Sequence, residues 1–194
     1  MVDYPSLRLA KAAARRDILA RRAALTDLAS PAVALSDHVA AWTRAGSCVA
    51  AYVPVGSEPG SVALLDALTG RGCRVLLPIV SADVLDWAAY DGVLAPGPWG
   101  LRQPAGPRLG VAALATADAV LVPALAADRR GTRLGRGAGF YDRSLRRVRP
   151  GTPLAALLHD GELVEQLLPA EPHDVPVTAA ITPSDGVVEL TRSG

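Results

Sequence analysis

The chemistry of this chain centres on residues 133–142, which read RLGRGAGFYD. Three glycines alternate with other residues there: Gly135, Gly137 and Gly139. Such a backbone can approach a ligand closely and turn successive amides toward an anion. Arg133 and Arg136 add planar, permanently charged groups that bind phosphate oxygens, and a helix expected to begin near Phe140 would add the positive end of its dipole. The stretch predicts a nucleotide triphosphate site.

An acid follows directly after this loop. Asp142 offers the hard oxygen that Mg²⁺ prefers, and Mg²⁺ usually takes only one or two protein carboxylates. The alternative interpretation is a glycine-rich surface turn with solvated arginines. Neither a GxxxxGK[ST] P-loop nor a complete GxGxxG fingerprint is present, so the sequence predicts a different nucleotide-binding fold.

Short apolar runs bounded by Gly, Pro or charge predict the strands that position this loop. They are residues 47–55, 74–79, 119–123 and 153–158. With a short helix at 61–69, they favour an α/β fold with a largely parallel sheet, and the loop follows the strand at 119–123, where sites of open α/β sheets lie. Residues 86–90 could form an edge strand, and the Gly- and Pro-rich residues 91–110 predict a loop or flap without regular structure.

The first segment of the chain predicts an amphipathic helix over residues 6–28. Its apolar positions recur at spacings of seven, four and seven: Leu7, Ala14, Ile18 and Leu25. Lys11, Arg15 and Arg22 would flank this stripe at its border with solvent, as a basic ridge. Ser30 followed by Pro31 predicts the start of a second helix that reaches about residue 45.

Composition narrows the class of protein. The 194 residues fit one domain, and 20 Lys and Arg against 19 Asp and Glu leave a net charge of +1, so we expect neither a nucleic acid nor a membrane partner. Cys48 and Cys73 have no disulfide or zinc spacing, and the N-terminal segment lacks the apolar run of a signal peptide. A cytoplasmic protein is expected.

Several motifs in order along the chain carry a family resemblance. The segment PALAADRRGTRLGRGAGFYDRSL resembles the signature of the 5-formyltetrahydrofolate cyclo-ligase family, also called 5,10-methenyltetrahydrofolate synthetase. Further matches cover nearly the whole chain: Lys11 with Arg15, YVPVGSE around Glu58, Leu77-Pro78, Trp99-Gly100, Gln103-Pro104 and LPAEPHDVPV.

The resemblance implies a fold and an activity. The fold would be a three-layer α/β/α domain of the ribose-phosphate isomerase and CoA-transferase class over residues 1–194, with N-terminal helices over 6–45 packed on the sheet. The activity would be the ATP- and Mg²⁺-dependent conversion of 5-formyltetrahydrofolate to 5,10-methenyltetrahydrofolate through a phosphorylated formyl group, a ligase reaction of folate one-carbon metabolism. The protein would act as a monomer on this small-molecule substrate.

The resemblance also implies roles for particular residues. Those implied for ATP are Lys11, Arg15, Arg133, Leu134, Gly135, Arg136, Gly137, Ala138, Gly139, Phe140 and Tyr141. Those implied for the folate are Val53, Glu58, Trp99, Arg136, Gly137, Ala138, Gly139 and Phe140. Asp142 and Asp174 would contact the metal, and Arg136 would be catalytic. The three histidines have no partner spacing, so no general base is assigned: His38, His159 and His173.

Three positions depart from the family pattern. Ala138 stands where many relatives carry Lys, Phe140 where they carry Tyr, and Thr178 where a second acid is common. Two other functions stay open. One is a non-catalytic nucleotide- or RNA-binding protein of the same fold, which the low net charge disfavours. The other is a sugar-phosphate or CoA enzyme, because fold alone does not fix function.

Overall fold

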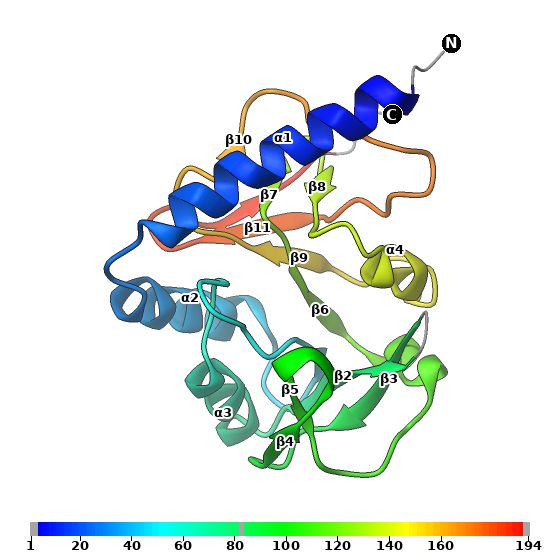
Figure 1. Ribbon diagram of the computed structural model, residues 1–194. Helices are drawn as coiled ribbons and strands as arrows, with labels where there is room; N and C mark the ends of the chain where they lie inside the picture. Colours follow the sequence, from blue (N-terminus) through cyan, green and yellow to red (C-terminus); the bar gives the residue numbers. More distant parts are fainter. Residues whose placement is uncertain (1–3, 82–83, 192–194) are drawn as a thin grey trace.

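A seven-stranded, mostly parallel sheet forms the centre of the fold, which a computed structural model describes for residues 4–81 and 84–191 (Figure 1). Its inner strands pair in parallel, and only the two edge strands pair antiparallel. In spatial order the strands are β12 (Gly186–Glu189), β11 (Ala179–Thr182), β9 (Leu154–Leu157), β6 (Ala119–Pro123), β1 (Cys48–Ala50), β2 (Arg74–Ser81) and β3 (Val84–Ala89). The expected α/β class and largely parallel sheet are confirmed.

Helical segments cover both faces of this sheet. On one face lie α2 (Ala29–Trp42) and α3 (Val62–Gly70), and on the other lie α4 (Phe140–Leu145) and the 3₁₀ segment η2 (Val111–Thr116). Neighbouring residues of a strand point to opposite faces, as Val49 and Ala50 of β1 do, and both are fully buried. The strands are therefore continuously apolar instead of alternating, and the fold has three layers.

A second, smaller sheet lies between the large sheet and the N-terminal helix α1 (Tyr4–Ala23) (Figure 1). Its strands, in spatial order, are β10 (Leu163–Val164), β7 (Ala126–Asp128) and β8 (Arg133–Leu134). Ile18 of α1 packs against Leu125 and Leu134 of this region. Strands of two or three residues carry no recognisable apolar period, so the sequence did not predict them.

The helix boundaries differ from those expected near residue 28. The first helix ends at Ala23, and Leu25 is 41% exposed instead of continuing the apolar stripe. The second begins at Ala29, where the Asp27 carboxylate accepts hydrogen bonds from the backbone N–H groups of Ala29 and Ser30, at 2.9 and 3.2 Å. The N-cap is Leu28, so the cap predicted at Ser30 is wrong and Ser30 lies in the first turn of the helix. None of the helices in the described part of the chain is long and apolar enough to cross a membrane.

The Gly- and Pro-rich segment 91–110 contains regular structure, contrary to expectation. An antiparallel hairpin joins β4 (Leu94–Pro96) to β5 (Arg102–Pro104) through the single-turn 3₁₀ segment η1 (Pro98–Gly100). Each strand has only three residues, and prolines at the ends of both strands obscured the pattern. The hairpin lies alongside β2 and forms one wall of the cavity described next.

Candidate active site

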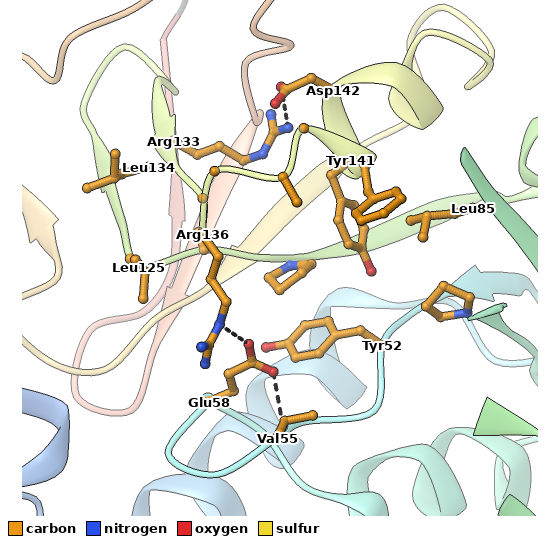
Figure 2. Close-up of a pocket in the computed structure, with 18 of the residues that line it drawn as sticks. Tyr52, Val55, Glu58, Leu85, Leu125, Arg133, Leu134, Arg136, Tyr141 and Asp142 are labelled. Atoms are coloured by element: carbon orange, nitrogen blue, oxygen red, sulfur yellow. Dashed lines mark hydrogen bonds and ion pairs between the residues drawn. The ribbon is translucent and has the colours of Figure 1, made fainter. Parts of the chain in front are cut away.

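A cavity of about 690 Å³ lies where β1 and β6 end, lined by residues of α1, the small sheet, the hairpin and the loop before α4. Figure 2 shows some of the residues that line it. The structure brings to this one cavity every residue that the sequence predicted for the site: Lys11, Arg15, Val53, Glu58, Trp99, Arg133, Leu134, Gly135, Arg136, Gly137, Ala138, Gly139, Phe140, Tyr141, Asp142 and Asp174. Those residues are spread along the chain from Lys11 to Asp174. The cavity is therefore the candidate active site.

Two arginines from different helices hold the glycine-rich loop. Arg15 of α1 donates from Nε to the carbonyl oxygen of Gly135 at 2.8 Å, and Arg143 of α4 donates to the carbonyl oxygen of Ala138 at 3.0 Å. The Arg143 guanidinium also lies 5.2 Å from the centroid of the Phe140 ring. Arg143 was not among the residues predicted for the site, although its position three residues after Phe140 in the helix places it on the same face.

The backbone conformation of the loop favours glycine at two positions. Gly137 has φ of 104° and Gly139 has φ of 70°, a region that other residues rarely adopt. A Cβ on Gly139 would lie 2.7 Å from an Arg143 nitrogen, and one on Gly137 would lie 3.4 Å from Arg15 Cζ. The loop is thus a short backbone segment with cations packed on it.

The helix that follows the loop contributes less positive charge than expected. α4 has six residues, and its N-cap, Gly139, makes no side-chain capping bond. Few aligned peptide dipoles add along so short a helix. An anion in this cavity would therefore depend mainly on the arginine and lysine side chains.

Arg133 is buried at the base of the loop and already has protein acceptors. Its guanidinium pairs with Asp142 at 2.5 Å and donates a second hydrogen bond to the carbonyl oxygen of Val175. Asp142 also accepts from the backbone N–H of Val175 at 3.3 Å. The predicted phosphate ligand and the predicted metal ligand thus bond each other in this structure, as Figure 2 shows.

Lys11 and Arg22 of α1 are buried, which corrects their expected place at the border with solvent. Lys11 Nζ lies 2.8 Å from Glu171 and 2.9 Å from Asp174, and the Lys11 residue is 7% exposed. Burial lowers the pKa of Lys11, but the hydrogen bonds to the two carboxylates outweigh it and raise the pKa above its ordinary value. These acids lie some 160 residues away in sequence, so no local pattern indicated them.

Carboxylates that could bind a divalent metal ion lie beside both Lys11 and Arg133. Glu171, His173 and Asp174 offer ligand atoms that all lie within 4.8 Å of one another, and Asp142 stands apart on Arg133. Burial raises the pKa of Asp174, but the hydrogen bonds from the Glu171 amide and from Lys11 lower it by more. The net pKa is therefore below its ordinary value, which favours the ionised form. The oxygen donors fit Mg²⁺, provided that Lys11 and Arg133 release them.

The opposite end of the cavity holds the predicted substrate residues. The Glu58 carboxylate accepts from Arg136 Nε at 2.9 Å and from the Val55 backbone N–H at 3.0 Å (Figure 2). Val53 is half-buried, whereas Trp99 at the hairpin tip is 76% exposed and has φ of 56°, which is strained for a tryptophan. This end combines one fixed carboxylate with apolar and aromatic walls.

Two phenols lie between the ends of the cavity. Burial raises the pKa of Tyr52 and of Tyr141, so both are neutral donors at physiological pH. Tyr52 donates to the carbonyl oxygen of Pro59 at 2.7 Å. The Tyr141 hydroxyl is buried and has no hydrogen-bond partner among the described residues, a condition that costs about 1–3 kcal/mol.

Comparison with known proteins fixes the family. The profile of the 5-formyltetrahydrofolate cyclo-ligase family matches residues 8–183. The chain belongs to this family. It is 50% identical to the 5-formyltetrahydrofolate cyclo-ligase of Mycolicibacterium smegmatis over 153 residues, which cover 75% of this chain and 78% of that one. It is 34% identical to the Escherichia coli K12 cyclo-ligase over 142 residues, 70% of this chain and 78% of the other.

Solved structures agree with this cyclo-ligase assignment. The 5,10-methenyltetrahydrofolate synthetase of Aquifex aeolicus superposes with a TM-score of 0.75 at 27% identity, covering 95% of this chain and 94% of that one. The synthetase of Mycoplasma pneumoniae gives a TM-score of 0.69 at 21% identity over 88% of this chain and 96% of the other, a likeness that concerns the fold alone. The resemblance predicted from the sequence motifs is confirmed.

Proposed function

We propose that the protein is an ATP-dependent 5-formyltetrahydrofolate cyclo-ligase. It would close 5-formyltetrahydrofolate into 5,10-methenyltetrahydrofolate and release ADP and phosphate, as a single-domain monomer in the cytoplasm. The observation that carries the proposal is the bond between Arg136 of the glycine-rich loop and Glu58 of the opposite wall, at 2.9 Å. The side chains expected to bind the two reactants therefore meet at one point in a single cavity.

The reaction needs an activated formyl group, because a formyl oxygen on N5 is a poor leaving group. That oxygen attacks the γ-phosphorus of ATP and ADP departs, which leaves a phosphate on the formyl carbon. N10 then attacks this carbon, the N10–C bond forms, the C–O bond to phosphate breaks and N10 loses its proton. The protein's contribution is positioning of the reactants and stabilisation of charge.

The nucleotide end of the cavity would bind the phosphates through cations and backbone amides. Arg136 is the most exposed of the predicted cations, with 54% of its side chain accessible, so it can move toward a phosphoryl group at little cost. Arg15 would act differently, because its Nε is already bonded to the Gly135 carbonyl oxygen and fixes the loop. We assign Arg136 the role of stabilising charge on the transferred phosphoryl group.

Mg²⁺ would be held by Asp142 and Asp174, whose carboxylate oxygens suit its preference for hard ligands. When bound with ATP, the ion supplies neutralisation of phosphate charge. Arg133 and Lys11, which pair with these two acids in the structure, would then turn to phosphate oxygens. The cavity thus provides both signs of charge that a metal–triphosphate complex requires.

The substrate end would recognise the pterin of the folate. The Glu58 carboxylate is acceptor-only and suits the donor-rich edge of that ring, and Val53 offers an apolar contact. Trp99 on the hairpin can stack on a flat ring, which would also bury an indole that is now 76% exposed.

One assay tests the proposal. Purified protein is mixed with Mg²⁺, ATP and 5-formyltetrahydrofolate, and the near-ultraviolet absorbance of the methenyl product is followed together with ADP. We expect equal amounts of both products and none without ATP. If ATP binds but neither product forms, the catalytic proposal is lost and a non-catalytic nucleotide-binding protein is the better reading. The molar mass measured by light scattering in the same buffer tests the proposal that the protein is a monomer.

A further inference from the structure

The loop that carries Glu58 contains no helix or strand and is shaped by a backbone turn and by side chains. Residues 51–61 connect β1 to α3; the Glu58 N–H donates to the Val55 carbonyl oxygen at 3.2 Å, and the Glu58 carboxylate accepts from the Val55 N–H at 3.0 Å. Tyr52 donates to the Pro59 carbonyl oxygen at 2.7 Å. One further contact comes from a distant part of the chain: the ring Nε2 of His159 lies 2.9 Å from the carbonyl oxygen of Ser57.

His159 follows β9 and is 8% exposed, yet it does not line the cavity. A carbonyl oxygen can only accept, so Nε2 of this histidine carries the proton in this contact. The backbone N–H of His159 donates to Glu162 Oε2 at 2.8 Å. The backbone at His159 is therefore fixed by Glu162, and the ring presents one N–H to the residue that precedes Glu58.

A buried ion pair anchors this histidine to α1. Arg22 donates two hydrogen bonds to the Glu162 carboxylate, both of 2.7 Å, and a third to the Ala124 carbonyl oxygen at 2.8 Å. The two side chains are 1% and 6% exposed. A buried ion pair seldom adds net stability over apolar residues of the same size, so position is what this one supplies. A continuous hydrogen-bonded path thus joins α1 to the Glu58 loop.

We propose that His159 is a positioning residue for Glu58: its Nε2–H holds the Ser57 carbonyl oxygen and so keeps the Glu58 carboxylate directed into the substrate end of the cavity. The proposal rests on the proposed function for the identity of the substrate. Without the bond, only the Glu58 N–H, which donates to the Val55 carbonyl oxygen at 3.2 Å, still orients the Ser57–Glu58 peptide, so the carboxylate is held less firmly in its place. Folate binding then weakens, while the nucleotide end, which is built from α1 and the loop before α4, keeps its geometry.

The test compares His159→Phe, which keeps the ring volume but removes the donor, with His159→Gln, whose amide N–H can reach the same oxygen. We expect His159→Phe to raise the KM for 5-formyltetrahydrofolate about tenfold. This is roughly the effect of losing one hydrogen bond, here the one that holds the Ser57 carbonyl oxygen next to Glu58. The KM for ATP should change less than about twofold, and His159→Gln should restore most of the folate affinity. His159→Ala is measured alongside, so that the result does not depend on one variant folding.

His38 is the matched control, because its ring Nε2 makes the same kind of contact, 3.1 Å from the Pro183 carbonyl oxygen, away from the cavity. His38→Phe should leave both KM values unchanged at a comparable loss in Tm. The positioning role is refuted if the His159 variants leave the folate KM unchanged, or raise both KM values equally. Equilibrium binding of 5-formyltetrahydrofolate to each variant separates this outcome from failure of the proposed function, because it needs no turnover.

Discussion

Replacement of Arg136 by alanine should lower turnover by orders of magnitude and leave the fold intact. The Arg136 side chain is 54% exposed and its one ion pair, with Glu58, joins it to a partner that is 13% exposed. An ion pair open to solvent on one side contributes about 0–1 kcal/mol, which for a chain of this size corresponds to a Tm loss of at most about 4 °C. The expected loss in kcat/KM is much larger, about 10²–10³-fold, because a cation on a transferred phosphoryl group contributes mainly in the transition state.

The assay measures kcat/KM from the methenyl product and Tm from circular dichroism for the same preparations. Arg136→Lys keeps the charge but not the planar fork, so it should recover part of the activity. Arg129→Ala is the control, because Arg129 forms a comparable exposed pair with Glu165 at 2.7 Å and lies outside the cavity. A variant Arg136→Ala with kcat/KM within about threefold of the wild type would refute the role given to the loop.

Three further predictions concern stability and the loop backbone. Arg22→Met should lower the free energy of unfolding by about 3 kcal/mol, measured in urea, because it leaves Glu162 charged and buried; adding Glu162→Gln should recover part of this, and no recovery would contradict the reasoning. Gly135→Ala should keep the wild-type Tm, since its Cβ would meet no atom within 4 Å, yet raise the KM for ATP; an unchanged KM would place the nucleotide elsewhere. The Cys48 amide holds the pKa of Asp118 below its usual range, so this acid stabilises the fold above about pH 4 and the contribution disappears as pH falls through the lowered pKa. In Asp118→Asn the urea midpoint of unfolding should therefore depend less steeply on pH between about pH 5 and 2. An unchanged slope of midpoint against pH would refute this role of Asp118.

The sequence predicted β1, β2, β6 and β9 of the central sheet, and β3 as an edge strand, because the sheet is covered on both faces; β11 and β12 were not predicted. Strands such as β6 and β9 must then be continuously apolar, and an apolar run between Gly, Pro or charged residues is visible without any partner. The small sheet and the β4–β5 hairpin consist of strands of two or three residues, whose pairing depends on tertiary contacts. No local pattern of that length distinguishes a strand from a loop.

The residues of the candidate site were predicted where the pattern is local in sequence and missed where it is not. The glycines and arginines of the loop predict an anion site by type and spacing alone, and the structure places them in one cavity. The partners of α1 could not be found in this way, because Lys11 bonds Asp174 and Arg22 bonds Glu162 across 163 and 140 residues. A charged residue beside an apolar stripe looks solvated until the segment that buries it is known, and so Lys11 and Arg22 were placed at the surface.

The charges of the site explain how a chain with a net charge of +1 can hold a cluster of cations. Three of the predicted cations each bond one of the predicted acids: Lys11 with Asp174, Arg133 with Asp142, and Arg136 with Glu58. Each of these three cations is thus paired with an acid in the half-buried cavity, where an unpaired charge would be costly. Each pair joins a group suited to phosphate with one suited to Mg²⁺ or to the pterin. Binding of the reactants would therefore exchange partners within the site, and the side chains that pair with one another in this structure would be the ones that recognise the ligands.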